Sequence, residues 1–446
     1  MIVMKFGGSS ISNADRIKSI AKIIQMSLNR KPFIVTSAMG KTTDNLLQAG
    51  ENALHGTVNL EEIKTLHYDT LKELGLKKEK EKIEDIFKEL ANLLWGIYLL
   101  KELSPRTKDY LVSFGERLSA KILAAYLSKV KIPAQSFDAW DIGFTSNSDF
   151  TNGEVLDESY EKISQSLGKL KSDYSYTPVI TGFIAKDKSG NITTLGRGGS
   201  DLTASVLGAA LDVEEIEVWK DVDGILTTDP RIVKHARPVQ AISFEEASEL
   251  AYFGAKVLHP RSIIPAMLKN IPVRVKNFYD FDHPGTVILK DFKDEKSLLR
   301  VITFKRNVTL IDVVSTRMLG QYGFMSKVFQ IFNDEKISVD MVATSEISIS
   351  MTLNDYRENL DTLKKELEKI ANIEIKKGKS IITMIGNVKH SSEILEQVFN
   401  ALKAKGINVQ MISQGASKVN ISFIVDDREM ETCVKDLHKI FFEETT

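Results

Sequence analysis

The chain of 446 residues is long enough for roughly two to four domains, and its hydrophobic fraction of 43% is ordinary for packed globular cores. Its 59 basic and 60 acidic residues nearly cancel, which argues against nucleic acid or an anionic membrane surface as a partner. The single cysteine excludes a disulfide framework and no apolar run could span a bilayer, so we expect a cytoplasmic protein whose partners are small molecules.

Short apolar runs alternate with helical patterns up to about residue 290. Strands are predicted at residues 2–6 (IVMKF) and 33–37 (FIVTS), and apolar residues recur at helical spacing between them. Further strands are predicted at 178–181, 215–219 and 273–278, and further helices at 204–211 and 245–253. This alternation predicts an α/β domain at residues 1–295, with a mainly parallel sheet between helices.

A repeat with a spacing of 70 residues follows after about residue 298. The positions Val328, Phe329, Ile337, Val339 and Met341 recur as Val398, Phe399, Ile407, Val409 and Met411. Each copy reads as a helix, a strand at 337–341 (ISVDM) or 407–411 (INVQM), a polar turn and a second strand. We interpret the copies as two small α+β domains at residues 296–380 and 381–446. A chance alignment of unrelated segments is the alternative.

Two glycine-rich segments, far apart in the sequence, each lie between a predicted strand and a predicted helix. In residues 5–8 (KFGG), paired glycines let backbone N–H groups approach a phosphate, and the lysine adds a positive charge. In residues 193–201 (TTLGRGGSD), the planar guanidinium group of Arg197 suits a carboxylate, and Asp201 lies near the start of a helix. A tight turn and a helix cap are the plainer alternatives.

Three further features suit a nucleotide or an amino acid. Residues 219–231 end a strand in acidic residues and turns, where Asp221 and Arg231 could meet ribose, metal or phosphate. Lys256 lies near a helix end, and Glu116 lies in a first helical turn, where it suits an α-ammonium group. Taken alone, each could equally be a turn, a C-cap or a complement to a helix dipole.

Two known nucleotide-binding motifs are each excluded by a single residue that does not match. Residues 40–42 (GKT) resemble the end of a P-loop, but Val35 stands where that motif requires glycine. Asp201 stands where a dinucleotide-binding GxGxxG requires its last glycine, so no dehydrogenase fingerprint remains. No two histidines have HxxxH spacing, and His259 before Pro260 is interpreted as structural. We therefore predict no metal site built from protein ligands.

Five strings in this order resemble the aspartokinases of the amino acid kinase family: KFGGSS, SFGE, TTLGRGGSD, DVDGI with TTDPR, and GAKVLHP. The resemblance covers essentially the whole chain. It implies an amino acid kinase fold that holds aspartate and ATP on facing lobes, followed by two intertwined ACT domains of the ferredoxin-like type. It also implies transfer of the γ-phosphoryl group of ATP to the β-carboxylate of L-aspartate. The product, 4-phospho-L-aspartate, begins the pathway to lysine, threonine and methionine.

The resemblance assigns site residues position by position. The implied catalytic residues are Lys5, at the transferring phosphoryl group, and Asp201, which organises Lys5. The implied aspartate-binding residues are Thr43, Glu116, Arg197, Gly198, Gly199 and Ser200. The implied ATP-binding residues are Lys5, Phe6, Gly7, Gly8, Lys220, Asp221, Leu226, Arg231 and Lys256. At positions 220 and 226 the family usually has threonine and tyrosine.

The residue types agree with this chemistry. A β-carboxylate with an unperturbed pKa of about 3.9 is already ionised at neutral pH, so the reaction needs no general base. It needs in-line alignment and neutralisation of phosphoryl charge, which lysine, backbone amides and Mg²⁺ supply. We expect Mg²⁺ to be held through ATP and water rather than by a cage of protein ligands.

A regulatory site is also implied by the resemblance. Its residues would be Met318, Gly323, Phe324, Met325, Val339, Asp340, Ser345 and Glu346. A helix N-terminus would receive the carboxylate of an amino acid and Asp340 its ammonium group. These strings are similar to those of lysine-responsive aspartokinases, so lysine is the first expected inhibitor and threonine the second. The same domains are expected to join copies into a homodimer or homotetramer; association without an effector is the alternative.

Two rival functions remain. Another carboxylate or phosphate kinase of the same fold, such as a glutamate kinase, is disfavoured by the paired repeats and by residues 113–116 (SFGE). A non-catalytic amino acid sensor is disfavoured by the presence of Lys5, Arg197 and Asp201. The missing dinucleotide fingerprint argues against a fused homoserine dehydrogenase.

Overall fold

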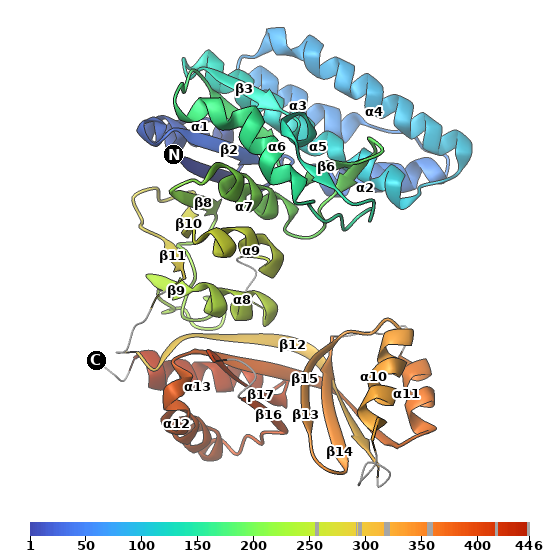
Figure 1. Cartoon of the computed structure of the whole chain (residues 1–446), viewed down its shortest axis with the longest axis vertical. Helices are drawn as coiled ribbons and strands as arrows, with labels where there is room; N and C mark the ends of the chain where they lie inside the picture. The colour runs from blue at the N-terminus through green and yellow to red at the C-terminus, as the bar shows by residue number, and fades with distance from the viewer. Residues whose placement is uncertain are drawn as a thin grey trace. The chain divides into compact units, whose positions relative to one another are not determined.

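The computed structural model of the chain describes residues 1–254, 258–290, 292, 297–315, 322–354, 360–414 and 418–443 (Figure 1). The chain divides into two compact units. The first comprises Met1–Ile225, Gln240–Phe244 and Val257–Phe292, and the second comprises Leu226–Val239, Glu245–Lys256 and Lys293–Thr446. The domain limits at residues 295 and 380 stay a prediction, and residue 380 falls inside strand β15 (Asn372–Gly386).

The first unit is built on an eight-stranded sheet with the order β3-β5-β2-β1-β8-β10-β11-β9. Its strands are β1 (Ile2–Phe6), β2 (Pro32–Thr36), β3 (Ala134–Phe137), β5 (Thr177–Thr181), β8 (Glu215–Lys220), β9 (Ala241–Ser243), β10 (Val273–Asn277) and β11 (Thr286–Leu289). Every neighbouring pair is parallel except β10 and β11. The predicted α/β class with a mainly parallel sheet is confirmed. A smaller sheet contains β4 (Thr145–Ser146), β6 (Ile184–Asp187) and β7 (Ile192–Thr194).

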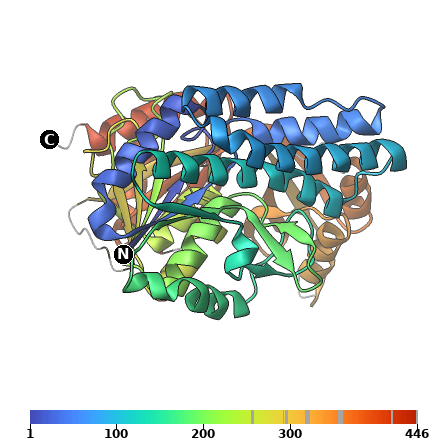
Figure 2. The ribbon, with the colours of Figure 1, turned by 90° about the horizontal axis from the view of Figure 1, so that it is seen from above.

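Helices cover both faces of the large sheet (Figure 2). The helices of this unit are α1 (Ala14–Met26), α2 (Thr42–Leu54), α3 (Glu61–Glu73), α4 (Lys80–Leu100), α5 (Pro105–Lys129), α6 (Glu158–Leu167), α7 (Gly199–Leu211) and α9 (Pro260–Lys269). Short 3₁₀ turns lie at Leu28–Arg30, Lys77–Glu79, Ala139–Ile142 and Gly168–Lys171. The core on one face joins the sheet to α1 and α5, while α7 packs on the other.

Strand β1 sends a charged side chain into the layer between the sheet and α7. All of its residues are buried, and Ile2, Met4 and Phe6 belong to the core shared with α1 and α5. Because side chains alternate along a strand, Lys5 points to the opposite face. There it meets the first turn of α7, which explains how a buried lysine can be accommodated.

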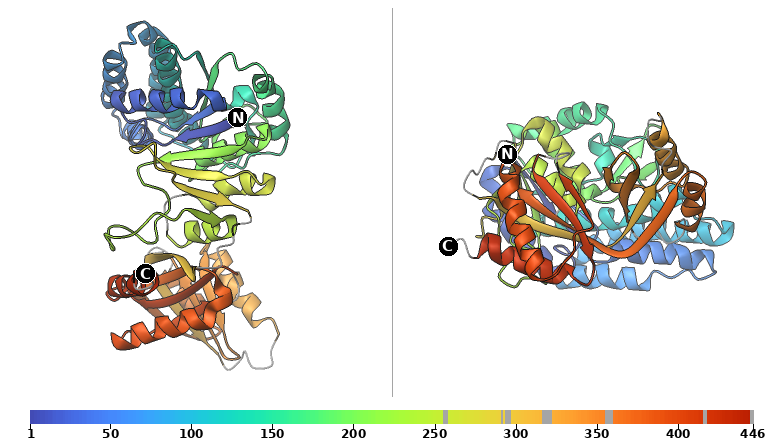
Figure 3. Two further views of the ribbon diagram at one scale, coloured as in Figure 1. Left: turned by 90° about the vertical axis from the view of Figure 1, so that its left-hand side faces the viewer. Right: turned by 90° about the horizontal axis from the view of Figure 1, so that it is seen from below.

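The second unit is built on one six-stranded sheet of order β13-β14-β12-β15-β17-β16 (Figure 3). Its strands besides β15 are β12 (Leu299–Val314), β13 (Val339–Thr344), β14 (Ser348–Leu353), β16 (Met411–Gln414) and β17 (Asn420–Asp426). Its helices are α8 (Phe244–Tyr252), α10 (Phe324–Asp334), α11 (Leu360–Glu368), α12 (Ser391–Ala404) and α13 (Met430–Phe442), with a 3₁₀ turn at Val388–His390. The long strands β12 and β15 pair along their whole length, so the two α+β copies share a continuous sheet.

The predicted first strand of each repeat begins later than expected. Residues 337 and 407 instead close the preceding helices, where their backbone N–H groups donate to Phe332 O at 2.9 Å and Leu402 O at 3.0 Å. The residues just before them, Lys336 and Gly406, have positive φ angles of 56° and 66°. This arrangement is a helix C-cap of the Schellman type, whose apolar residue mimics the start of a strand in sequence. Among the described residues, no helix is long and apolar enough to cross a membrane.

Replacement of Arg300 by methionine tests how helix α8 is attached to the sheet of the second unit. Arg300 Nε lies 2.7 Å from Glu246 Oε1, and both side chains are buried. Arg300→Met leaves a buried carboxylate without this cation, so we expect a loss of about 3–5 kcal/mol in the free energy of unfolding. Urea denaturation measures this loss. Arg306→Met, which breaks the exposed pair with Glu431, is the matched control and should cost about 1 kcal/mol or less. Equal losses would contradict this account.

Candidate active site

The two glycine-rich segments meet in the first unit through a buried ion pair. Lys5 Nζ lies 2.6 Å from Asp201 Oδ1, and each side chain is 8% exposed. Lys220, at the end of β8, places its ammonium 3.6 Å from the other oxygen of Asp201. Asp201 lies in the first turn of α7, so the helix dipole also favours its negative charge. Residues separated by almost two hundred positions thus form one charged cluster.

The protonation of this cluster follows from its burial. Burial by itself raises the pKa of Asp201, but the ammonium groups of Lys5 and Lys220 outweigh it and hold that pKa below the usual value. Burial lowers the pKa of Lys220, the positive charge of Lys5 lowers it further, and Asp201 offsets only part of this. Asp201 is therefore held in its ionised form between the side chains of Lys5 and Lys220.

Glu116 lies close to Lys5 and is held in its protonated form. It is 3% exposed, and its Oε1 accepts a hydrogen bond from the Ala38 N–H at 3.1 Å. Within the described part of the chain, its other oxygen, Oε2, has no hydrogen-bond partner. Burial raises the pKa of Glu116 to about 8, although Ala38 and Lys5 oppose the shift. A buried carboxyl group with an unused oxygen is suited to receive a cationic group from outside.

The segment after β2 forms a further wall of the site, which the sequence analysis did not single out. Ser37 Oγ donates to Ser200 Oγ at 3.0 Å, and Ser119 of α5 donates to the Ser37 carbonyl at 2.6 Å. Together with the Ala38 contact, these bonds join α5, the end of β2 and the start of α7. The position of Ser37 at the end of a predicted strand was the available signal, because parallel strands place such residues at a common edge.

The backbone of residues 7 and 8 follows β1 closely. A Cβ atom on Gly8 would lie 3.0 Å from the Ala38 carbonyl oxygen, so this position admits only glycine without displacement. Gly7 lies against Lys5, since a Cβ there would be 3.6 Å from its Nζ. Phe6 is fully buried and stacks on Trp219, which leaves only its backbone for a nucleotide.

The Arg197 loop is exposed and packs on residues of α9. Gly198 has a φ angle of 75°, and a Cβ there would lie 2.5 Å from the Cβ of His259. His259 thus fills space beneath the loop, as its structural interpretation requires. Arg197 makes no hydrogen bond or ion pair with any residue that the structure describes, so its guanidinium is available to a ligand. Thr43 lies partly buried in the first turn of α2, which packs against α5 beside Glu116.

The remaining residues predicted to bind ATP lie in different parts of the chain. Asp221 is exposed and directly follows β8. Leu226 and Arg231 belong to the second unit, where the Arg231 side chain is 83% exposed and pairs with Asp229 at 2.5 Å. Lys256 lies outside the described residues. Nucleotide contacts at these positions stay predictions.

The predicted effector residues all belong to the second unit, apart from Met318, which lies outside the described residues. Gly323, Phe324 and Met325 begin α10, Val339 and Asp340 begin β13, and Ser345 and Glu346 lie in the turn before β14. Asp340 is already engaged, because Lys305 Nζ lies 2.7 Å from Oδ2 and the Tyr252 hydroxyl donates to Oδ1 at 3.0 Å. This carboxylate therefore binds an ammonium group within its own chain.

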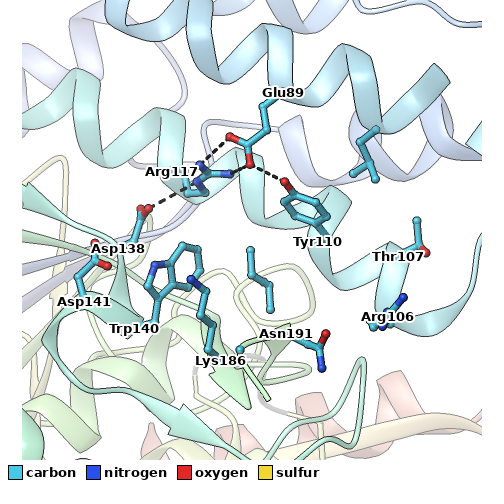
Figure 4. Close-up of a pocket in the computed structure, with 13 residues that line it drawn as sticks. Glu89, Arg106, Thr107, Tyr110, Arg117, Asp138, Trp140, Asp141, Lys186 and Asn191 are labelled. Carbon is cyan, nitrogen blue, oxygen red and sulfur yellow. Dashed lines mark hydrogen bonds and ion pairs between the residues drawn. The ribbon is translucent and has the colours of Figure 1, made fainter. Parts of the chain in front are cut away.

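A cavity of about 630 Å³ lies beside α5 but contains none of the predicted residues (Figure 4). Its polar groups largely satisfy one another. Glu89 accepts from both terminal nitrogens of Arg117, at 3.1 and 2.9 Å, and from the Tyr110 hydroxyl at 2.5 Å. Lys186 lies over the Trp140 ring, 4.5 Å from its centre. No group of three or more metal-binding side chains occurs among the described residues, in this cavity or elsewhere.

Comparisons with known proteins agree with the fold. Residues 1–277 match the amino acid kinase family, and residues 311–359 and 382–441 match the ACT domain. Chloroplastic aspartokinase 1 of Arabidopsis thaliana is 53% identical over 460 residues, which cover 99% of this chain and 80% of the relative. Lysine-sensitive aspartokinase 3 of Escherichia coli is 33% identical, with 99% of both chains covered.

Solved structures give the same result. Aspartokinase III of E. coli in complex with aspartate and ADP has a TM-score of 0.84 at 32% identity, with 99% of this chain and 100% of that chain covered. Its complex with lysine and aspartate has a TM-score of 0.81 with the same coverage. The fold is that of an amino acid kinase followed by ACT domains. The chain belongs to the aspartokinases, the members of that family that phosphorylate aspartate with ATP.

Replacement of Glu116 by glutamine tests its protonation. Folded Glu116 keeps its proton up to about pH 8, whereas an unfolded glutamate loses it above a pKa of about 4.3. The folded state therefore binds one more proton between these values, and wild-type stability falls as pH rises through this window. Between pH 5 and pH 8 the wild-type protein should lose on the order of 3 kcal/mol more than Glu116→Gln. Urea denaturation at both pH values measures the difference, and parallel losses would contradict the assignment.

Proposed function

We propose that the Lys5–Asp201 cluster transfers the γ-phosphoryl group of ATP to the β-carboxylate of L-aspartate, giving 4-phospho-L-aspartate. The observation that carries the proposal is the buried pair of Lys5 and Asp201, with Lys220 and the protonated Glu116 beside it. An E. coli relative that matches the whole chain binds aspartate and ADP in its crystal structure. Formation of 4-phosphoaspartate is then the first step toward lysine, threonine and methionine.

Aspartate would be bound through both its α-carboxylate and its α-ammonium group. Arg197, which is exposed and without a partner among the described residues, suits the α-carboxylate. Ser200, Gly198, Gly199 and Thr43 are the further proposed contacts of the substrate. The unused oxygen of Glu116 suits the α-ammonium group. Arrival of that cation favours ionisation of Glu116, so binding of aspartate at neutral pH releases a proton.

Lys5 would act on the transferring group. Its ammonium is fixed by Asp201 before any ligand arrives, which removes the entropic cost of ordering a long side chain. The backbone N–H groups near Gly7 and Gly8 would meet the phosphates. The β-carboxylate attacks as an anion, so the cluster needs to align the reactants and neutralise charge rather than to remove a proton.

Mg²⁺ belongs to the proposal as part of the nucleotide complex. Asp201 is shared between two lysines and Glu116 is protonated, so the cluster offers no free pair of carboxylates. The ion would be held by phosphate oxygens of ATP and by water, and it would neutralise part of the phosphate charge.

Replacement of Lys5 by alanine is the direct test of this function. We expect kcat for aspartate-dependent formation of ADP to fall at least about 1,000-fold, because the cation at the transferring group is lost. Trapping of the acyl phosphate with hydroxylamine identifies the product. Lys18→Ala, which removes an exposed lysine paired with Asp15, is the control and should retain normal turnover. Near-normal kcat in Lys5→Ala would refute the assignment, and a wild-type protein that consumes no ATP with aspartate would be a sensor instead.

Regulation by an amino acid is proposed for the second unit, with lysine favoured and threonine second. A lysine-sensitive E. coli relative covers the whole chain, and its structure has been solved with lysine. The helix start at Gly323 and the carboxylate of Asp340 provide the expected partners for an amino acid. Because Lys305 and Tyr252 already occupy Asp340, an incoming ammonium would have to displace them.

Replacement of Asp340 by asparagine tests the effector site. The wild-type protein should lose most of its activity at millimolar lysine, and Asp340→Asn should require at least tenfold more lysine for the same inhibition. The uninhibited rate is measured in parallel, together with the response to threonine. An absent response of the wild-type protein to lysine at these concentrations would end the lysine proposal.

The second unit is also the proposed site of self-association, as a homodimer or homotetramer. Equivalent positions of the two repeats expose apolar side chains, with Phe329 and Phe399 at 37% and 41% and Val342 and Ile412 at 38% each. Such patches on edge strands and helices suit burial against another copy. A cytoplasmic location is retained as part of the proposal.

A further inference from the structure

Helix α5 carries a second buried carboxylate, Asp109, for which the proposed mechanism has no role. Asp109 is 1% exposed and lies seven residues before Glu116, which places both side chains on the same face of the helix, two turns apart. A carboxylate is costly to bury unless its oxygens accept hydrogen bonds. The partners of Asp109 therefore reveal what it holds in place.

All of these partners belong to segments that support the Arg197 loop. Oδ2 of Asp109 accepts from the backbone N–H of Thr194 at 2.9 Å, and Oδ1 accepts from the Thr194 hydroxyl at 2.7 Å. Oδ2 also accepts from the backbone N–H of Thr151 at 2.8 Å. Thr194 is the last residue of β7 and lies three positions before Arg197. The carboxylate thus fixes the point from which the loop departs.

The turn at residues 151–153 locks the loop from its other side. The Gly153 N–H donates to the Thr194 carbonyl at 2.7 Å. A Cβ on Gly196 would lie 2.7 Å from Asn152 Oδ1, so the turn and the loop are in direct contact. Arg261 of α9 donates to the same Asn152 oxygen at 2.7 Å. The turn and the loop form one clamped assembly, and Asp109 ties it to α5.

We propose that Asp109 is a positioning residue that sets the spacing between Glu116 and Arg197, and so selects an acceptor with its ammonium and carboxylate groups on the same carbon. The inference rests on the proposed function, in which these two residues bind the two ends of an amino acid. One of them is carried by α5 and the other by the loop that Asp109 joins to α5. When this link is lost, the loop shifts relative to α5. The distance between Glu116 and Arg197 then no longer fits the ammonium and carboxylate groups of one substrate.

Replacement of Asp109 by asparagine tests the spacing. An amide retains one acceptor oxygen but presents N–H donors where the carboxylate accepted, so part of the link is broken. We expect the KM for aspartate to rise at least tenfold, while the KM for ATP changes less than twofold. Succinate lacks the ammonium group, so its binding does not depend on the spacing between Glu116 and Arg197. Its inhibition constant against aspartate should therefore change less than threefold.

Asp187→Asn is the matched control. Asp187 is also buried and accepts from the backbone N–H groups of Ser189 and Asn191, within the turn between β6 and β7. It also accepts from the Ser148 hydroxyl at 3.0 Å, and none of these bonds reaches α5. This variant should leave the ratio of the aspartate KM to the succinate inhibition constant unchanged. Thermal unfolding and ADP binding report whether each variant is folded. If Asp109→Asn does not fold, Thr194→Val removes one donor alone and should shift the same ratio about threefold.

The outcomes separate this inference from the function on which it rests. A wild-type protein that forms no ADP in response to aspartate would reject the proposed function itself. With an active wild-type protein, an unchanged aspartate KM in folded Asp109→Asn would overturn the positioning role. So would an equal rise in the aspartate KM and the succinate inhibition constant, because a general loosening of the site weakens both ligands alike.

Discussion

The buried ion pair between Lys5 and Asp201 is the constraint on which the rest of the first unit depends. Two charged groups leave water for the space between a sheet and a helix, and their attraction has to offset that cost. It does so because the strand and the helix are rigid and place the atoms at 2.6 Å. Lys220 provides a second cation, and the start of α7 adds a favourable dipole. The lysine proposed to act in phosphoryl transfer is thereby ordered in advance.

The charge of the whole cluster follows from the same burial. With Glu116 protonated, Asp201 is the ionised carboxylate that lies beside Lys5 and Lys220 in this buried cluster. The ammonium of Lys5 favours a triphosphate and disfavours further cations, except next to Glu116, whose ionisation is coupled to the arrival of an ammonium group. In the proposed mechanism, Glu116 thus contributes both to amino acid recognition and to the electrostatic balance of the cluster. The pKa of Glu116 in the free protein therefore differs from its pKa with substrate bound.

The second unit depends on the pairing of two long strands in addition to the buried pair of Arg300 and Glu246. Strands β12 and β15 run through both repeats and pair with each other throughout, so neither repeat has a complete sheet of its own. A ligand that alters the strands of one repeat acts on a structure shared by both. The contact of Asp340 with Lys305 and Tyr252 joins β13 to β12 and α8, which makes this carboxylate a junction within the unit.

The sequence by itself determined the α/β class, the parallel strands, the paired repeats and the family, because periodicity and short motifs are local properties of the chain. It also indicated Lys5, Asp201 and Glu116 through the resemblance, and the structure brings these three together. It did not indicate Ser37, Ala38 or Asp109, whose roles depend on hydrogen bonds between segments distant in sequence. Nor could it separate a helix cap from a strand start at residues 337 and 407. The hydrogen bonds of Ser37, Ala38 and Asp109 and the raised pKa of Glu116 were decided only by tertiary packing, since burial and contacts between distant segments exist only in the folded chain.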